Sequence, residues 1–215
     1  GRNRDVEEVV KVVKDVVDAV KVPVIVWGTS NDEKDAALLR RVAEVCEGKN
    51  VSIGPLSEKN YKQIGATAIA YNHNVLASSP IDVNLAKQLN ILLGNLGVQD
   101  EKILIDPTTG GLGYGLEYSY SVIERDRMAA LTQEDVKLQY PIVCNLAQEI
   151  WKTKEARLTR DDNPKLGDAK KRTILLESVS AMSMLIAGAD VVIMRHPDSV
   201  ALVREMIKEL TSQGG

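Results

Sequence analysis

The chain has 215 residues, a formal net charge of −3 and 44% hydrophobic residues, a composition typical of a folded domain of medium size and not of a disordered segment. The acidic balance and the lack of any Lys/Arg run argue against a polyanion-binding surface, so we expect no nucleic-acid partner. No apolar run approaches the roughly 20 residues of a membrane span, so we expect no membrane partner either.

Short apolar runs bounded by turn residues alternate along the chain with segments of helical periodicity. The predicted helices cover residues 5–20, 31–48, 61–65, 82–94, 116–131, 174–187 and 200–210. The predicted strands cover residues 24–27, 51–53, 66–71, 103–105, 141–144 and 190–194. A charged stretch over 151–171, which contains Pro164 and Gly167, is expected to form an exposed loop or lid.

This alternation is typical of parallel β/α units and predicts an α/β fold of the TIM (β/α)8 type, in a single domain over residues 1–215. A closed barrel needs eight units, and about six are present here behind a leading helix. We therefore expect about two β/α units to be missing on the N-terminal side, because the chain is a fragment or because another chain supplies them. A doubly wound open sheet is the alternative architecture.

A glycine-rich loop follows the predicted strand 103–105, with glycines at positions 110, 111, 113 and 115. The loop has neither the G-x-G-x-x-G spacing nor the Lys-Ser/Thr ending of a nucleotide signature. Glycine accepts positive φ and lets the backbone approach a bound group closely. We interpret the loop as a ligand surface at the carboxyl end of a strand, and the alternative is a turn that only reverses the chain.

The carboxyl ends of parallel strands lie on one face, which is where barrels of this type hold their active sites. This rule places on that face a set of mainly neutral hydrogen-bonding residues, namely Thr29, Ser30, Asn31, Gly54, Asn72, His73, Asn74, Asp106, Thr108, Thr109, Asn145, Arg195 and His196.

Several members of this set have a structural explanation beside a functional one. Asp106 is either a general base or the cap of its own turn before proline. Arg195 either pairs with a phosphate or carboxylate or closes a salt bridge at the barrel rim. The asparagines either bind amides and ring edges or satisfy exposed backbone groups. Trp27 and Trp151 are either packing residues or aromatic walls of a site.

The sequence contains no pattern that indicates a metal site. His73 and His196 are the only histidines, and no His/Asp/Glu cluster has the ligand spacing of zinc or iron. Cys46 and Cys144 stand far apart without a C-x-x-C motif, which suits a reducing compartment, and we expect a cytoplasmic protein. Each histidine is either a hydrogen-bonded structural residue or a functional one.

Three segments resemble motifs of one protein family. Residues 72–92 (NHNVLASSPIDVNLAKQLNIL) resemble the central motif of the small subunit of the corrinoid iron–sulfur protein, whose archaeal counterpart is the delta subunit of the acetyl-CoA decarbonylase/synthase complex. Residues 105–119 (IDPTTGGLGYGLEYS) are similar to a second motif, and residues 194–197 (MRHP) resemble a third at the last predicted strand. The resemblance runs from Val22 to the end of the chain, although the family's barrel begins about two β/α units earlier.

The resemblance implies a TIM barrel without catalytic residues of its own, in a system that makes or cleaves acetyl-CoA. Such a subunit pairs with a large, gamma-type corrinoid iron–sulfur subunit, and it has a methyltransferase and acetyl-CoA synthase as transient partners. It caps a corrinoid (cobalamin) shared with the large subunit and holds no metal itself, so neither histidine is expected to bind cobalt. The residues expected to face the corrinoid are Thr29, Asn31, Asn72, His73, Asn74, Asp106, Thr108, Gly110, Gly111, Gly113, Asn145, Arg195 and His196.

The alternative function is a pterin-binding, corrinoid-dependent methyltransferase on the same fold. In that case Asp106 and Asn145 would hold the pterin ring. Binding of a methyl-pterin to the chain without a corrinoid partner would distinguish this enzyme from a capping subunit.

Overall fold

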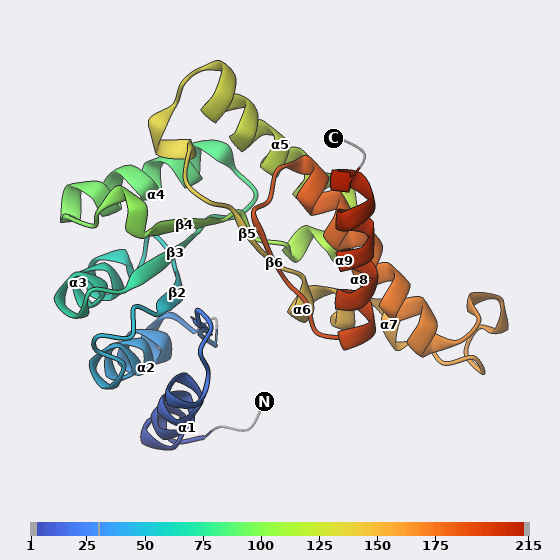
Figure 1. Ribbon diagram of the computed structural model, residues 1–215, viewed down its shortest axis with the longest axis horizontal. Coiled ribbons are helices and arrows are strands. Elements are labelled where there is room, and N and C mark those ends of the chain that lie inside the picture. Colours follow the sequence, from blue (N-terminus) through green and yellow to red (C-terminus); the bar gives the residue numbers. More distant parts are fainter. Residues whose placement is uncertain (1–3, 30, 213–215) are drawn as a thin grey trace. The chain divides into compact units, whose positions relative to one another are not determined.

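The computed structural model describes residues 4–29 and 31–212, so Ser30 lies outside the described residues (Figure 1). The strands are β1 (Ile25–Trp27), β2 (Ser52–Leu56), β3 (Asn74–Ser78), β4 (Ile103–Asp106), β5 (Val143–Asn145) and β6 (Val191–Ile193). The α-helices are α1 (Val6–Ala19), α2 (Asp32–Val45), α3 (Tyr61–Tyr71), α4 (Val83–Leu96), α5 (Leu116–Thr132), α6 (Leu146–Glu149), α7 (Lys154–Arg157), α8 (Ala169–Ala187) and α9 (Pro197–Ser212). Short 3₁₀ turns are η1 (Asp100–Lys102), η2 (Gly110–Gly113), η3 (Val136–Leu138), η4 (Ile150–Lys152) and η5 (Pro164–Leu166).

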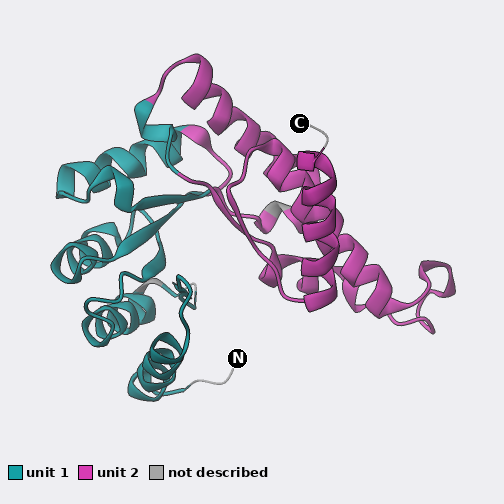
Figure 2. Ribbon diagram, viewed as in Figure 1, with its two compact units in different colours: residues 1–79, 84–106, 136–140 teal, residues 80–83, 107–135, 141–215 magenta. Residues whose placement is uncertain are grey.

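The chain divides into two compact units, coloured teal and magenta in Figure 2. Unit 1 comprises Gly1–Ser79, Asn84–Asp106 and Val136–Tyr140. Unit 2 comprises Pro80–Val83, Pro107–Asp135 and Pro141–Gly215.

Unit 1 contains a four-stranded parallel sheet in the order β1-β2-β3-β4. Helices α2 and α3 pack on the inner strands β2 and β3, where Ile53 and Leu76 are fully buried. Ile105 of the edge strand β4 is also fully buried. Helix α1 begins at Asp5, whose carboxylate accepts the backbone N–H of Glu7, and it packs on α2. The predicted amphipathic helix over 5–20 is thereby confirmed.

Unit 2 contains the parallel pair β5–β6, with Asn145 in register with Ile193. Helix α8 packs on α5 and α9. It begins at Asp168, whose carboxylate accepts the backbone N–H of Lys171 at 2.8 Å, and it ends at Gly188, which has a φ of 119°. The predicted elements 141–144, 174–187 and 190–194 therefore form as expected, with small shifts of their ends.

The predicted strand over 66–71 is wrong. Helix α3 continues through this segment to Tyr71 and ends at Asn72 in the left-handed conformation, with a φ of 57°, and β3 follows at Asn74–Ser78. A short run of alternating alanines fits either structure by pattern, and alanine is the strongest helix former. Burial of Ile64 and Ala68 on one helix face decides in favour of the helix.

The predicted end of the second strand at Gly54 is also wrong, because β2 continues to Leu56. A Cβ at Gly54 would lie 2.6 Å from the Cβ of Leu76 on the neighbouring strand. This glycine therefore serves close packing inside the sheet and does not belong to a strand-end loop.

Candidate functional site

Three of the expected site residues lie at the amino end of β3, and their expected position at a strand's carboxyl end is corrected. Asn72 ends α3, and His73 is buried with its Nε2 donating to the carbonyl oxygen of Ala43 at 2.9 Å. Asn74 donates from its side chain to the hydroxyl of Ser52 at 3.3 Å. The error follows from the strand misplaced over 66–71, since β3 ends at Ser78.

At the carboxyl end of β1, two expected site residues are held by a carboxylate that the sequence analysis did not single out. Buried Asp35 accepts the backbone N–H and the hydroxyl of Thr29, both at 2.7 Å, and the backbone N–H of Asn31 at 3.2 Å. The side chain of Asn31 accepts the N–H of Lys34 at 3.0 Å and so caps α2. These contacts fix the turn between β1 and α2.

Asp106 lies at the carboxyl end of β4 in unit 1, as expected, and it is buried. It pairs with Ser78 of β3, and its carbonyl oxygen accepts the backbone N–H of Ser79 at 3.0 Å. The hydroxyl of Ser79 is buried without a hydrogen-bond partner among the described residues. The carboxyl edge of this sheet therefore offers a buried carboxyl at the end of β4 and a buried hydroxyl just after the end of β3.

The carboxyl end of β6 in unit 2 is fixed by Glu177 of α8, which is fully buried. Its two oxygens accept the backbone N–H groups of Arg195 at 2.7 Å and His196 at 3.2 Å. A buried carboxylate needs such partners, because an unpaired charge away from water is strongly destabilising. One side chain thus sets the positions of two expected site residues.

Arg195 and His196 gather around Trp151 of η4. The Trp151 and His196 rings stack with centroids 5.9 Å apart and an interplanar angle of 11°, and the Arg195 guanidinium carbon lies 5.0 Å from the Trp151 ring. His196 Nδ1 accepts the N–H of Asp198 at 3.1 Å, which leaves Nε2 as the nitrogen that carries the proton. The indole N–H of Trp151 is buried without a hydrogen-bond partner among the described residues.

The glycine-rich loop packs against the same part of unit 2, because η2 contacts both α6 and η4. The hydroxyl of Thr109 donates to the carbonyl oxygen of Asn145 at 2.7 Å, which ties the loop to the end of β5. Thr108 precedes it with a φ of 55°, and the side-chain oxygen of Asn145 is buried without a partner in the described part of the chain. We call this set of residues the unit 2 rim, comprising Thr108, Thr109, Gly110, Gly111, Gly113, Asn145, Trp151, Arg195 and His196.

Residues that sequence reasoning missed are the ones that hold the expected site residues in place. Glu177 had a signal, because it is the only charged residue in the predicted helix 174–187. A lone carboxylate in an apolar helix indicates a buried partner. Asp35 had no such signal, since charged residues surround it in the sequence.

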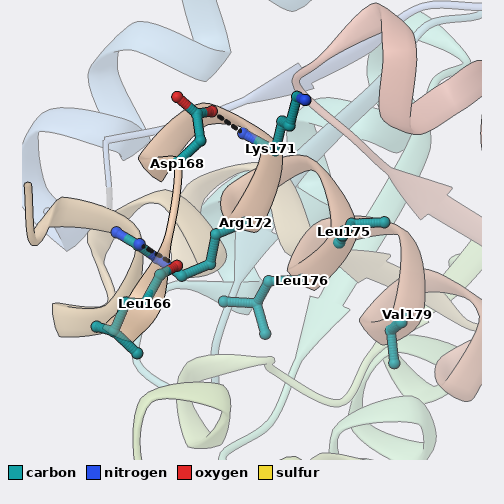
Figure 3. Close-up of a pocket in the computed structure, with 7 residues that line it drawn as sticks. All are labelled: Leu166, Asp168, Lys171, Arg172, Leu175, Leu176 and Val179. Atoms are coloured by element: carbon teal, nitrogen blue, oxygen red, sulfur yellow. Dashed lines mark hydrogen bonds between the residues drawn. The ribbon is translucent and has the colours of Figure 1, made fainter. Parts of the chain in front are cut away.

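A cavity of about 510 Å³ lies beside α8 (Figure 3). None of its lining residues belongs to the unit 2 rim. Its lining residues are Leu166, Asp168, Lys171, Arg172, Leu175, Leu176 and Val179. Arg172 donates to the carbonyl oxygens of Glu155 at 2.7 Å and Leu166 at 2.8 Å, and also to that of Leu158. The predicted exposed stretch 151–171 is therefore held to α8, and the Asp168 carboxylate and the Arg172 guanidinium of this cavity already have structural partners.

Comparison with known proteins identifies the family. Residues 2–211 match the family described as CO dehydrogenase/acetyl-CoA synthase delta subunit. The chain belongs to this family. Members of known name include the acetyl-CoA decarbonylase/synthase complex subunit delta of Methanopyrus kandleri, which is 38% identical over 204 residues, 94% of this chain and 50% of that protein. The subunit delta of Methanocaldococcus jannaschii is 34% identical over 215 residues, 100% of this chain and 52% of that protein.

The chain thus spans about half the length of the curated delta-subunit relatives that it matches. The names of these relatives describe them as subunits of a multi-subunit complex. Within residues 4–29 and 31–212, no helix is long and apolar enough to cross a membrane. The same residues include no group of three His, Cys, Asp or Glu side chains that could hold a metal ion.

Solved structures of similar fold are dihydropteroate synthases. A Yersinia pestis enzyme with a pterine-sulfa conjugate has a TM-score of 0.63 at 14% identity, over 99% of this chain and 77% of that chain. The Thermus thermophilus enzyme has a TM-score of 0.63 at 15% identity, over 100% of this chain and 82% of that chain. At this identity the likeness concerns the fold alone, and it confirms the predicted α/β fold of the TIM-barrel type.

Proposed function

We propose that this chain is the non-catalytic barrel part of a delta subunit, which pairs with a large, gamma-type corrinoid iron–sulfur subunit and caps its corrinoid. In this role it supports methyl transfer between a methyl-pterin and acetyl-CoA synthase, and the methyltransferase and the synthase are transient partners. Membership of the delta subunit family and the composition of the unit 2 rim support the proposal.

The unit 2 rim fits a corrinoid in its chemistry. A corrin is a broad, flat ring whose edge carries neutral amide groups. The rim offers one buried acceptor without a partner, the side-chain oxygen of Asn145, and one buried donor without a partner, the indole N–H of Trp151, among the described residues. Buried polar groups in folded proteins are nearly always hydrogen-bonded, so these two are suited to partners that another molecule brings.

Each part of the rim has a separate task in this proposal. The cobalt of a bound corrinoid supplies the methyl-transfer chemistry, and the protein supplies position and exclusion of water. Glu177 fixes the turn that carries Arg195 and His196, and Thr109 fixes the loop against Asn145. The unpartnered amide oxygen of Asn145 at the strand end is the single observation that carries the proposal.

The expected corrinoid-facing set becomes smaller on structural grounds. Asn72, His73 and Asn74 lie at the amino end of β3, so they no longer belong to it. Thr29, Asn31 and Asp106 remain predictions at the carboxyl edge of the unit 1 sheet. The proposal itself uses only the unit 2 rim.

The test uses the 215-residue chain and a large corrinoid iron–sulfur subunit, loaded with corrinoid or free of it. We expect the chain to bind the loaded subunit and to slow oxidation of its reduced cobalt, followed by absorbance. No complex, or no protection beyond that of the large subunit alone, would contradict the proposal. Micromolar binding of a methyl-pterin to the chain alone would instead favour the methyltransferase.

A further inference from the structure

Two tyrosines beside the glycine-rich loop are among the most exposed aromatic side chains described in this chain. Tyr114 is 91% exposed, and Tyr118 in the first turn of α5 is 55% exposed. By contrast, Tyr140 is buried and bonded to Lys137. An aromatic ring left in water beside a candidate site indicates a contact surface, because tyrosine combines a large apolar face with a hydroxyl donor.

Two glycines of the same loop have no reason within the chain to be glycine. A Cβ built at Gly110 or Gly113 meets nothing within 4 Å, and neither residue has a φ in the left-handed region. Gly54 and Gly188 differ, because a Cβ there would clash with a neighbour. A glycine that the fold does not require lowers stability, because it increases the conformational entropy of the unfolded chain. The bare backbone at these two positions is therefore suited to close contact with another molecule.

The surface formed by residues 110–118 is nearly neutral. Glu117 carries its only charge, and the rest of the segment is glycine, leucine and tyrosine. Its η2 turn contacts η4, and η4 carries Trp151. The Trp151 ring lies against the His196 ring and the Arg195 guanidinium. A nearly neutral, bare backbone flanked by aromatic rings suits a flat, neutral molecule.

We propose that residues 110–118, here called the glycine–tyrosine surface, contact the corrin ring directly. The backbone at Gly110 and Gly113 lies against the ring, and the hydroxyls of Tyr114 and Tyr118 donate to its amide groups. This inference rests on the proposed function and adds to it the residues that recognise the cofactor. The competing explanation is that this surface contacts the protein surface of the large subunit. The experiment distinguishes the two by comparing the corrinoid-loaded and corrinoid-free large subunit.

The glycine variants give the sharpest test, because stability and binding should respond differently. Gly110→Ala and Gly113→Ala should leave the melting temperature unchanged or raise it by up to about 4 °C, since a Cβ meets nothing in the chain. Each should weaken binding to the corrinoid-loaded large subunit by at least about fivefold, the effect of losing one important interface contact. Tyr114→Ala should weaken binding similarly, and Tyr114→Phe tests the hydroxyl alone.

The matched control is Leu131→Ala, which removes a side chain that is 76% exposed on the same helix α5. Every variant is also tested against the corrinoid-free large subunit. Weaker binding to the loaded form alone supports the inference. Equal weakening for both forms overturns it in favour of a protein contact, and unchanged binding of all variants overturns it in favour of a simple turn. Failure of the unsubstituted chain to bind would overturn the proposed function and this inference with it.

Discussion

Replacing Asp126 by asparagine should raise the stability of the chain at neutral and alkaline pH. Asp126 lies on the inner side of α5, fully buried, and both of its carboxyl oxygens lack hydrogen-bond partners among the described residues. Burial raises the pKa of this carboxyl from 3.8 to about 7; the charges of Arg125 and Arg127 lower it, and Asp82 raises it further. Ionisation of Asp126 therefore opposes folding.

The sign and size of the effect follow from the two pKa values. Below pH 3.8 the carboxyl is protonated in both states and has no effect on stability. Between pH 3.8 and about 7 the unfolded chain loses this proton while the folded chain keeps it, so stability falls as the pH rises. At about 1.4 kcal/mol for each pKa unit, the loss reaches about 4 kcal/mol above pH 7. Asparagine cannot ionise and does not incur this loss.

The assay is urea unfolding followed by circular dichroism, at several pH values between 4 and 8. The free energy of unfolding of Asp126→Asn minus that of the unsubstituted chain should grow by about 1 kcal/mol per pH unit and level off near pH 7. Asp15→Asn, at an exposed position of α1, is the control and should show no such growth. A difference that stays constant with pH would refute the reasoning.

The remaining predictions concern side chains that fix loops. Glu177→Gln should lower the free energy of unfolding by about 1–3 kcal/mol and shift the fluorescence of Trp151, and an unchanged emission spectrum would count against its positioning role. Arg172→Ala should speed proteolytic cleavage within residues 154–168, because four backbone carbonyls lose their donor, and equal cleavage rates would contradict this. Asp35→Ala should destabilise the chain by about 1–3 kcal/mol, measured by urea unfolding, with faster hydrogen exchange in the loop after β1.

Most of the fold could be predicted because its strands are short apolar runs between clear turn residues. The strand predicted over 103–105 forms as β4, which continues one residue further to Asp106 and ends before Pro107. The helix after the glycine-rich loop begins at Leu116, as predicted. The segment 66–71 failed because its alternating alanines satisfy both periodicities, and only tertiary burial of one face chooses the helix. Because of this error, Asn72, His73 and Asn74 were expected at the carboxyl end of a strand, whereas they lie at the amino end of β3.

The candidate site could be predicted where it depends on strand ends and could not where it depends on tertiary contacts. Asn145, Arg195 and His196 follow directly from the positions of β5 and β6. The carboxylate of Glu177, in contrast, reaches backbone groups 18 and 19 residues away, and no local pattern specifies such a pairing. Trp151 stayed ambiguous in the sequence because its contacts with His196 and Arg195 form only in the folded chain.

The position of β3 changes what the segment 72–92 signifies. Its strand contributes fully buried Val75 and Leu76 to the sheet, and its helix α4 buries Leu89. The strand and the helix of this segment are therefore architectural, and only the loop between them, which carries Ser79, reaches the carboxyl edge of the sheet. A likeness confined to this strand and helix would thus report a shared scaffold and would say nothing of a shared ligand.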